Sequence, residues 1–134
     1  MSNSAIATAL ETAVQTASTG VPTSWENVDF RPPVGAYQVV TVLFGQPENP
    51  TMGNQFFRQR GYLQVQLRYP LGEGKQNAVT RAEALRAAFP RGSSFTAGGI
   101  TVIIERSSEI MAGYTDENRF IVNVKIWFFA NIGA

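Results

Sequence analysis

The chain has 134 residues, of which 44% are hydrophobic and 16% charged, with a formal net charge of +1 and neither histidine nor cysteine. This length suits one domain, residues 1–134, built around a single core. The lack of cysteine excludes disulfides and thiolate chemistry, and the near-neutral charge argues against bulk attraction to nucleic acid or to an acidic membrane.

The N-terminal third predicts a helix, a loop and a strand. Ile6, Leu10 and Val14 recur at helical spacing, so we expect a helix over residues 5–17. Prolines interrupt residues 21–35 around Trp25 and Phe30, which predicts an ordered lead-in loop anchored by its aromatic side chains. Residues 36–44 are apolar on both faces and predict a central core strand, covered by a helix or by another subunit.

The next segment predicts a long loop, a strand and a helix. Residues 45–54 exceed a tight hairpin and predict a flap. Residues 57–69 then alternate as a half-buried strand, with Gly61 read as a bulge or a bend. One face of this strand carries Phe57, Leu63, Val65, Leu67 and Tyr69, and the other carries Arg58, Arg60, Tyr62, Gln64, Gln66 and Arg68. A helix follows at about 76–89 and ends before Pro90.

The C-terminal third predicts strands. Residues 93–97 and 100–105 flank Gly98-Gly99 and predict a hairpin, whereas residues 107–118 are polar and receive no element. Residues 119–129 alternate as a long last strand, with Trp127 and Phe129 on the side opposite Phe128. The order of elements predicts an α+β fold, with a mixed, largely antiparallel sheet of about five strands and two helices packed on one face.

Residues able to carry out catalysis are few. Histidine is absent, and the carboxylates Glu105, Glu109, Asp116 and Glu117 crowd a polar segment where a solvated role is the default. They lack the spacing of a calcium loop. The run 72–75, Gly-Glu-Gly-Lys, resembles the end of a phosphate loop, but Tyr69 and Gln76 break that pattern. We therefore expect no catalytic residue, no cofactor and no metal site.

Three groups of side chains are candidates for a protein interface. Arg58, Arg60 and Arg68 share a strand face, for which a solvated surface is the ordinary reading and a protein contact the alternative. Trp127 and Phe129 make one face of the last strand unusually apolar, so they are buried either under the N-terminal helix or lead-in loop or in a subunit contact. The same two alternatives, burial within the chain or a subunit contact, apply to three side chains in and around the long loop, Phe44, Met52 and Phe56.

Several segments together resemble the small tail-terminator-like proteins of long-tailed bacteriophages, over nearly the whole chain. No single segment is specific, but their order and spacing match. They are an N-terminal helix, Trp25-Glu26-Asn27-Val28-Asp29-Phe30, Pro32-Pro33, Arg60-Gly61-Tyr62-Leu63-Gln64-Val65, Tyr69-Pro70-Leu71-Gly72-Glu73-Gly74, Ala82-Glu83-Ala84-Leu85-Arg86-Ala87-Ala88-Phe89-Pro90-Arg91-Gly92 and Gly98-Gly99.

This resemblance implies a structural virion protein located in the tail or neck, and in the host cytoplasm during assembly. The family implies a homo-oligomeric ring, usually of six subunits, which caps the tail tube protein on one face and meets the head-completion or neck proteins on the other. DNA would pass through the lumen without specific binding. The alternatives are another neck or minor tail component, such as a head–tail adaptor, and, more distantly, a carboxylate-based enzyme.

Overall fold

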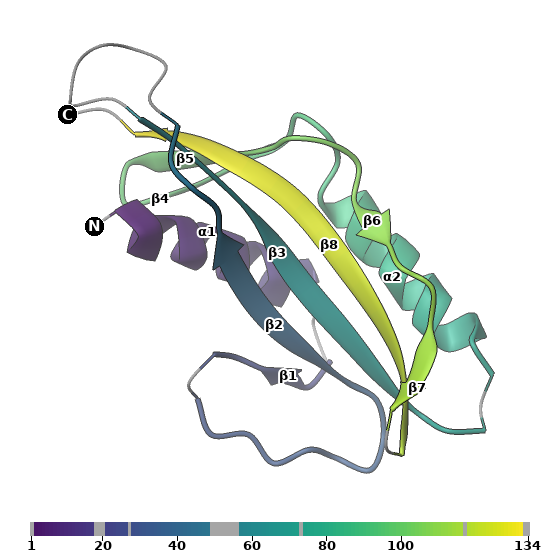
Figure 1. Ribbon diagram of the computed structural model, residues 1–134. Helices are drawn as coiled ribbons and strands as arrows, with labels where there is room; N and C mark the ends of the chain where they lie inside the picture. The colour runs from purple at the N-terminus through teal and green to yellow at the C-terminus, as the bar shows by residue number, and fades with distance from the viewer. Residues whose placement is uncertain are drawn as a thin grey trace.

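The computed structural model describes residues 2–17, 21–26, 28–48, 57–72, 74–116 and 118–132, and it contains two helices and eight strands within them (Figure 1). Neither helix of this described part is long and apolar enough to cross a membrane. The elements are α1 (Ser2–Ala17), β1 (Thr23–Ser24), β2 (Tyr37–Phe44), β3 (Phe57–Pro70), α2 (Gln76–Ala88), β4 (Ser94–Ala97), β5 (Ile100–Ile104), β6 (Glu109–Ile110), β7 (Tyr114–Asp116) and β8 (Arg119–Ile132).

The sheet is organised around β3 and β8, which pair antiparallel along their whole length from Phe57↔Ile132 to Pro70↔Arg119. The strand order is β1-β2-β3-β8-β5-β4, and among the described strands the β1–β2 pair is parallel while the others are antiparallel. The second edge of β8 is paired successively by β7, β6 and β5, because the chain from 100 to 116 runs back along it (Figure 1). The predicted α+β class is confirmed, with more strands than the five expected.

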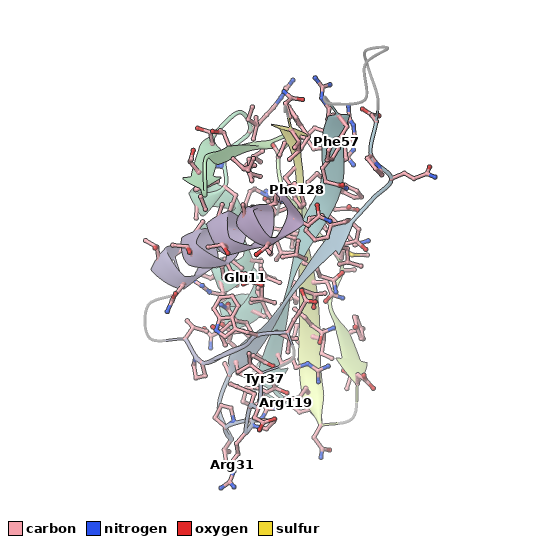
Figure 2. All side chains as sticks on the ribbon, turned by 90° about the vertical axis from the view of Figure 1, so that its left-hand side faces the viewer. Glu11, Arg31, Tyr37, Phe57, Arg119 and Phe128 are labelled. Carbon is pink, nitrogen blue, oxygen red and sulfur yellow. The ribbon has the colours of Figure 1, made fainter. Side chains whose placement is uncertain are left out.

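Both helices pack on one face of this sheet, which we call the helix face. Ile6, Leu10 and Val14 of α1 are fully buried there, as the helical spacing predicted. Ala78 and Ala82 of α2 are also fully buried, and their small side chains let this helix approach β8 closely. Figure 2 shows α1 lying across the strands, with Phe128 of β8 directed toward the core. The core therefore lies between the two helices and the apolar sides of β3 and β8.

The structure moves β2 away from the centre predicted for it. It lies second from the edge of the sheet, beside the two-residue strand β1. Beyond the end of β1, the side chain of Glu26 lies at this edge of β2, where its Oε1 accepts a hydrogen bond from the N–H of Val42 at 2.7 Å. In the described part of the chain no strand pairs with 41–44 along this outer edge, so the side chain of Glu26 occupies one of its free donors.

Gly61 is not a bulge, because the register runs unbroken through it as Phe44↔Gly61↔Phe128. A Cβ at this position would lie 2.2 Å from the carbonyl oxygen of Leu43 and 2.9 Å from Cζ of Phe128. The residue is therefore required for the close approach of a neighbouring backbone and an aromatic ring rather than for a change in register.

Replacing Gly61 with alanine is expected to lower the free energy of unfolding by about 3 kcal/mol, because the Leu43 carbonyl belongs to a paired strand and cannot move aside. Urea titration followed by circular dichroism measures the loss. Gly35→Ala is the matched control, since apart from its two chain neighbours no described residue has an atom within 4 Å of the added Cβ. Equal midpoints for the two variants would contradict the steric role of Gly61.

A second expectation concerns Glu11 of α1, labelled in Figure 2. Partial burial, and secondarily the nearby carboxylate of Glu26, raise the pKa of Glu11 above its ordinary value. The folded state thus binds this proton more tightly than the unfolded state, so the protein loses stability as pH rises through the carboxylate range. Glu11→Gln should stabilise the fold at pH 7, and the gain should vanish below about pH 4, where both states are protonated.

Urea midpoints measured from about pH 3.5 to pH 7 test this expectation, with the exposed Glu83→Gln as control. Parallel pH profiles for wild-type protein and Glu11→Gln would contradict it.

Candidate subunit interface on the open face

The face of the sheet opposite the helices, which we call the open face, is built from the alternate side chains of β2, β3 and β8. The register aligns Leu43, Tyr62 and Trp127 in one row across these three strands. Arg60 and Phe129 form a neighbouring pair, as do Arg58 and Asn131. The prediction that the arginines of β3 share a face is confirmed by this register.

Trp127 is the centre of a cluster on this face. Its ring lies 4.9 Å from the ring of Tyr62 between centroids, and the guanidinium carbon of Arg106 lies 4.3 Å from its centroid. The ammonium nitrogen of Lys125 lies 4.9 Å from the centroid of the Tyr62 ring. We call Leu43, Tyr62, Arg106 and Trp127 the Trp127 cluster. Leu43 is 38% exposed, and the cluster borders a shallow hollow of about 380 Å³.

Arg60 forms the polar rim of this hollow through two ion pairs. Its Nε lies 2.9 Å from Oε1 of Glu48, and its Nη1 donates to Oε2 of Glu105 at 2.8 Å. The hydrogen bond that Arg60 donates to Glu48, and secondarily the charge of Glu105, raise the pKa of Arg60, so its guanidinium stays charged. Because the groups are partly exposed, solvent screens the pairs and each contributes less than about 1 kcal/mol. Their main effect is to hold the guanidinium in a defined position.

The other predicted interface residues are distributed along the sheet. Arg58 stacks over the ring of Phe129 at 5.0 Å and donates from Nε to Oδ1 of Asn131. Phe44 is 37% exposed and packs edge-on against Phe128. Arg68 lies roughly 26 Å further along β3 than Arg60, where its Nε donates to Oε1 of Gln66. Met52 and Phe56, and most of the predicted 45–54 flap, fall outside the described residues.

The far end of the open face is closed by the lead-in loop. Arg119 donates from Nη1 to the carbonyl of Gly35 and from Nη2 to the carbonyl of Pro33, both at 2.6 Å. Its guanidinium lies over the ring of Tyr37, which packs against Phe30 (Figure 2). The interpretation of a covering loop therefore holds at this end, whereas α1 lies on the opposite face from Trp127 and Phe129.

The carboxylates considered as a catalytic group lie far apart. Glu105 pairs with Arg60, Glu109 stands opposite Lys125, and Asp116 stands opposite Arg119, so they follow the length of β8. Glu117 falls outside the described residues. Among the described acidic side chains, no three come together as metal ligands would. The glycines of the phosphate-loop-like segment, Gly72 and Gly74, adopt positive φ in the turn before α2.

The structure adds three residues that sequence reasoning missed, namely Leu43, Tyr62 and Arg106. Leu43 and Tyr62 were visible in the alternation, but their alignment with Trp127 depends on strand order. Arg106 follows β5 and reaches Trp127 because the N–H of Glu105 donates to the Trp127 carbonyl at 2.9 Å. Nothing in the local sequence around Arg106 indicates this contact.

Comparisons with known proteins agree with this architecture. A family model described as phage tail terminator protein matches residues 5–128. Four chains of solved structures match the fold. One of them, a protein without a descriptive name, superposes with a TM-score of 0.81 at 24% sequence identity, over 97% of this chain and 96% of the other. At that identity the likeness establishes the fold alone. No curated protein matches the sequence.

Removing Arg106 is expected to expose one side of the Trp127 ring. In a Trp25→Phe background, Arg106→Ala should shift the tryptophan emission to the red and increase acrylamide quenching, with a stability loss of about 1 kcal/mol or less. Arg58→Ala is the control, because Arg58 stacks on Phe129 instead. An unchanged emission spectrum in Arg106→Ala would show that the stacked arrangement does not persist in solution.

Proposed function

Because this chain belongs to the phage tail terminator family, we propose that it caps the finished tail tube as a hexameric ring and presents its other face to the head-completion or neck proteins. The family assignment itself makes the protein a structural component of a bacteriophage tail and places it in the virion. The match over residues 5–128 is the observation that carries the proposal. We further propose that residues 1–134 act as one domain that is made in the host cytoplasm before assembly.

The open face supports a role in protein contact. Aromatic and arginine side chains are enriched at the centres of protein interfaces, and here they lie together around Trp127. Leu43 remains more than one-third exposed beside them, and the equally exposed Phe44, the next residue of β2, packs against Phe128 on the other side of the sheet. We propose that Phe44, Arg58, Arg60, Trp127 and Phe129 contact the neighbouring subunit, together with Met52 and Phe56, and that Arg68 belongs to the margin of the same surface.

The electrostatics are compatible with a lumen through which DNA passes without being gripped. The net charge is +1, and the arginine at the centre of the open face is already paired with two carboxylates. Protein surfaces that hold DNA instead direct unpaired cations at phosphates. The proposal therefore assigns these arginines to protein contacts and gives them no part in binding DNA.

Location in the virion tests the role directly. Gold-labelled antibody should mark the head-proximal end of the tail in electron micrographs, and native mass spectrometry of detached tails should release a hexamer. Labelling along the tail shaft or on the head would favour another tail or neck component. Virions that lack the protein would refute the proposal.

Arg60→Glu is expected to weaken ring assembly more than folding. The change places a third carboxylate between Glu48 and Glu105, and the affected groups are partly exposed, so the free energy of unfolding should fall by about 1 kcal/mol. Because the proposal places the Arg60 guanidinium in the contact between subunits, the affinity of one subunit for the next should fall at least about tenfold. Arg91→Glu, in an exposed turn after α2, is the control. Unchanged ring formation would remove Arg60 from the interface.

A further inference from the structure

One apolar side chain of the lead-in loop, that of Val34, is unusually exposed to solvent. Val34 is 94% exposed, although the turn that bears it is firmly held. The carbonyls on either side of it, those of Pro33 and Gly35, both accept hydrogen bonds from Arg119 at 2.6 Å. The two hydrogen bonds come from one charged group, so the turn is fixed before anything contacts it. We call residues 33–35 the Val34 turn.

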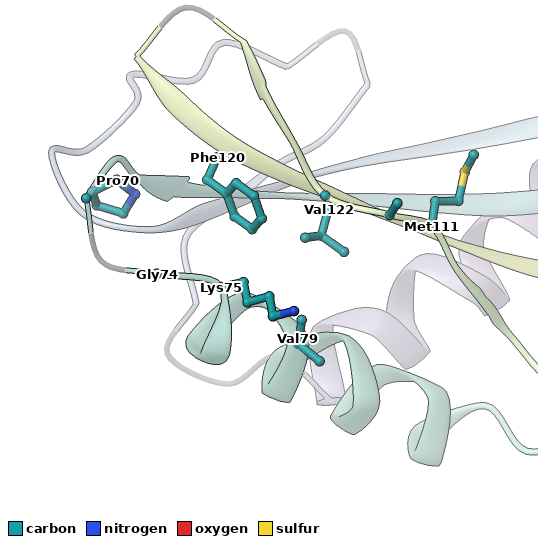
Figure 3. A pocket seen from close by; sticks show the side chains of 10 residues that line it. Pro70, Gly74, Lys75, Val79, Met111, Phe120 and Val122 are labelled. Carbon is teal, nitrogen blue, oxygen red and sulfur yellow. The ribbon is translucent and has the colours of Figure 1, made fainter.

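A hollow of about 640 Å³ opens on the helix face at the same end of the sheet (Figure 3). Phe120 and Val122 of β8 line it from above, and Lys75 and Val79 at the start of α2 line it from below. Gly113 completes the wall, where a Cβ would lie 2.3 Å from the Phe120 ring. The hollow is mainly apolar, and Lys75 is the charged side chain among its described lining residues.

The turn and the hollow are anchored by consecutive residues of β8. Arg119 holds the turn, and Phe120 lines the hollow. Successive side chains of a strand point to opposite faces, so the two features belong to opposite faces of the same strand end. In agreement with this, the Val34 side chain of a single copy lies in solvent rather than in its own hollow. Only a second copy can bring the two together.

We propose that the Val34 turn of each subunit docks into this hollow, between Phe120 and Val79, of the next subunit. This inference rests on the proposed ring, and it names the two surfaces that close it. A turn from one face entering a hollow on the other is a heterologous contact, which is the type that generates rings. The charges agree, because the exposed Asp29 lies five residues before Val34 in the chain and Lys75 lies at the hollow. Docking would bury Val34 and place Asp29 against Lys75.

Val34→Asp is the most direct test, because a side chain that is 94% exposed contributes little to folding. The variant should keep the wild-type unfolding midpoint and lose at least about tenfold in subunit affinity, measured by native mass spectrometry or sedimentation. Val34→Ile, which keeps the apolar shape, should assemble as wild type. Wild-type assembly by Val34→Asp would overturn the inference and leave the proposed function standing.

Charge exchange tests the predicted partner. Lys75→Glu should weaken assembly, and adding Asp29→Lys in the same chain should restore it, because each interface then again pairs opposite charges. Failure of the double variant to recover would remove the Asp29–Lys75 contact from the proposal.

Disulfide trapping tests the geometry, and the chain offers a clean background because it contains no cysteine. In virions assembled with the double variant Val34→Cys and Val79→Cys, oxidation should give a ladder of covalent oligomers on a non-reducing gel. The same should hold with Met111→Cys as the hollow position, whereas Thr101→Cys on β5 should remain monomeric.

The outcomes separate the two proposals. Monomers from both hollow variants, in virions that carry normal amounts of the protein, would overturn the docking but not the tail-end role. Absence of the wild-type protein from virions would overturn the role itself.

Discussion

The long pairing of β3 with β8 is the constraint on which the rest of this structure depends. Fourteen residues of each strand stay in one register from end to end, so the alternation of side chains is never interrupted. One set of positions builds the core beneath the helices, and the other builds the Trp127 cluster. The second edge of β8 is occupied by short strands of the chain from 100 to 116, which keeps this central strand from pairing elsewhere.

The open face shows how a surface can carry many cations without behaving as a basic patch. Arg58, Arg106, Arg119 and Lys125 each lie over an aromatic ring, and Arg60 lies between two carboxylates. Each of these four cations is thus stacked on an aromatic ring, and three of them are guanidinium groups. Such stacked pairs suit close contact with another protein, because guanidinium groups are weakly hydrated and their desolvation costs less free energy than that of ammonium groups. This arrangement is consistent with a structural rather than a chemical task.

Sequence patterns predicted the parts of this fold that repeat over many residues. The alternation in β3 and β8, the helical spacing of Ile6, Leu10 and Val14, and the Gly98-Gly99 hairpin with positive φ at both glycines were all recognisable. The strands β1, β6 and β7 have two or three residues, too few to show a period, and they form because β8 and β2 offer free edges. The position of β2 and the contact of Arg106 with Trp127 depend on strand order, which no local pattern encodes.

Glu26 gives the free margin of β2 a further property. Unpaired strand margins are templates for pairing with another extended polypeptide. Because the carboxylate of Glu26 already accepts the Val42 N–H, an incoming segment has to displace a charged group before it can pair here. Growth of the sheet into fibres by strand addition at this margin is thereby disfavoured.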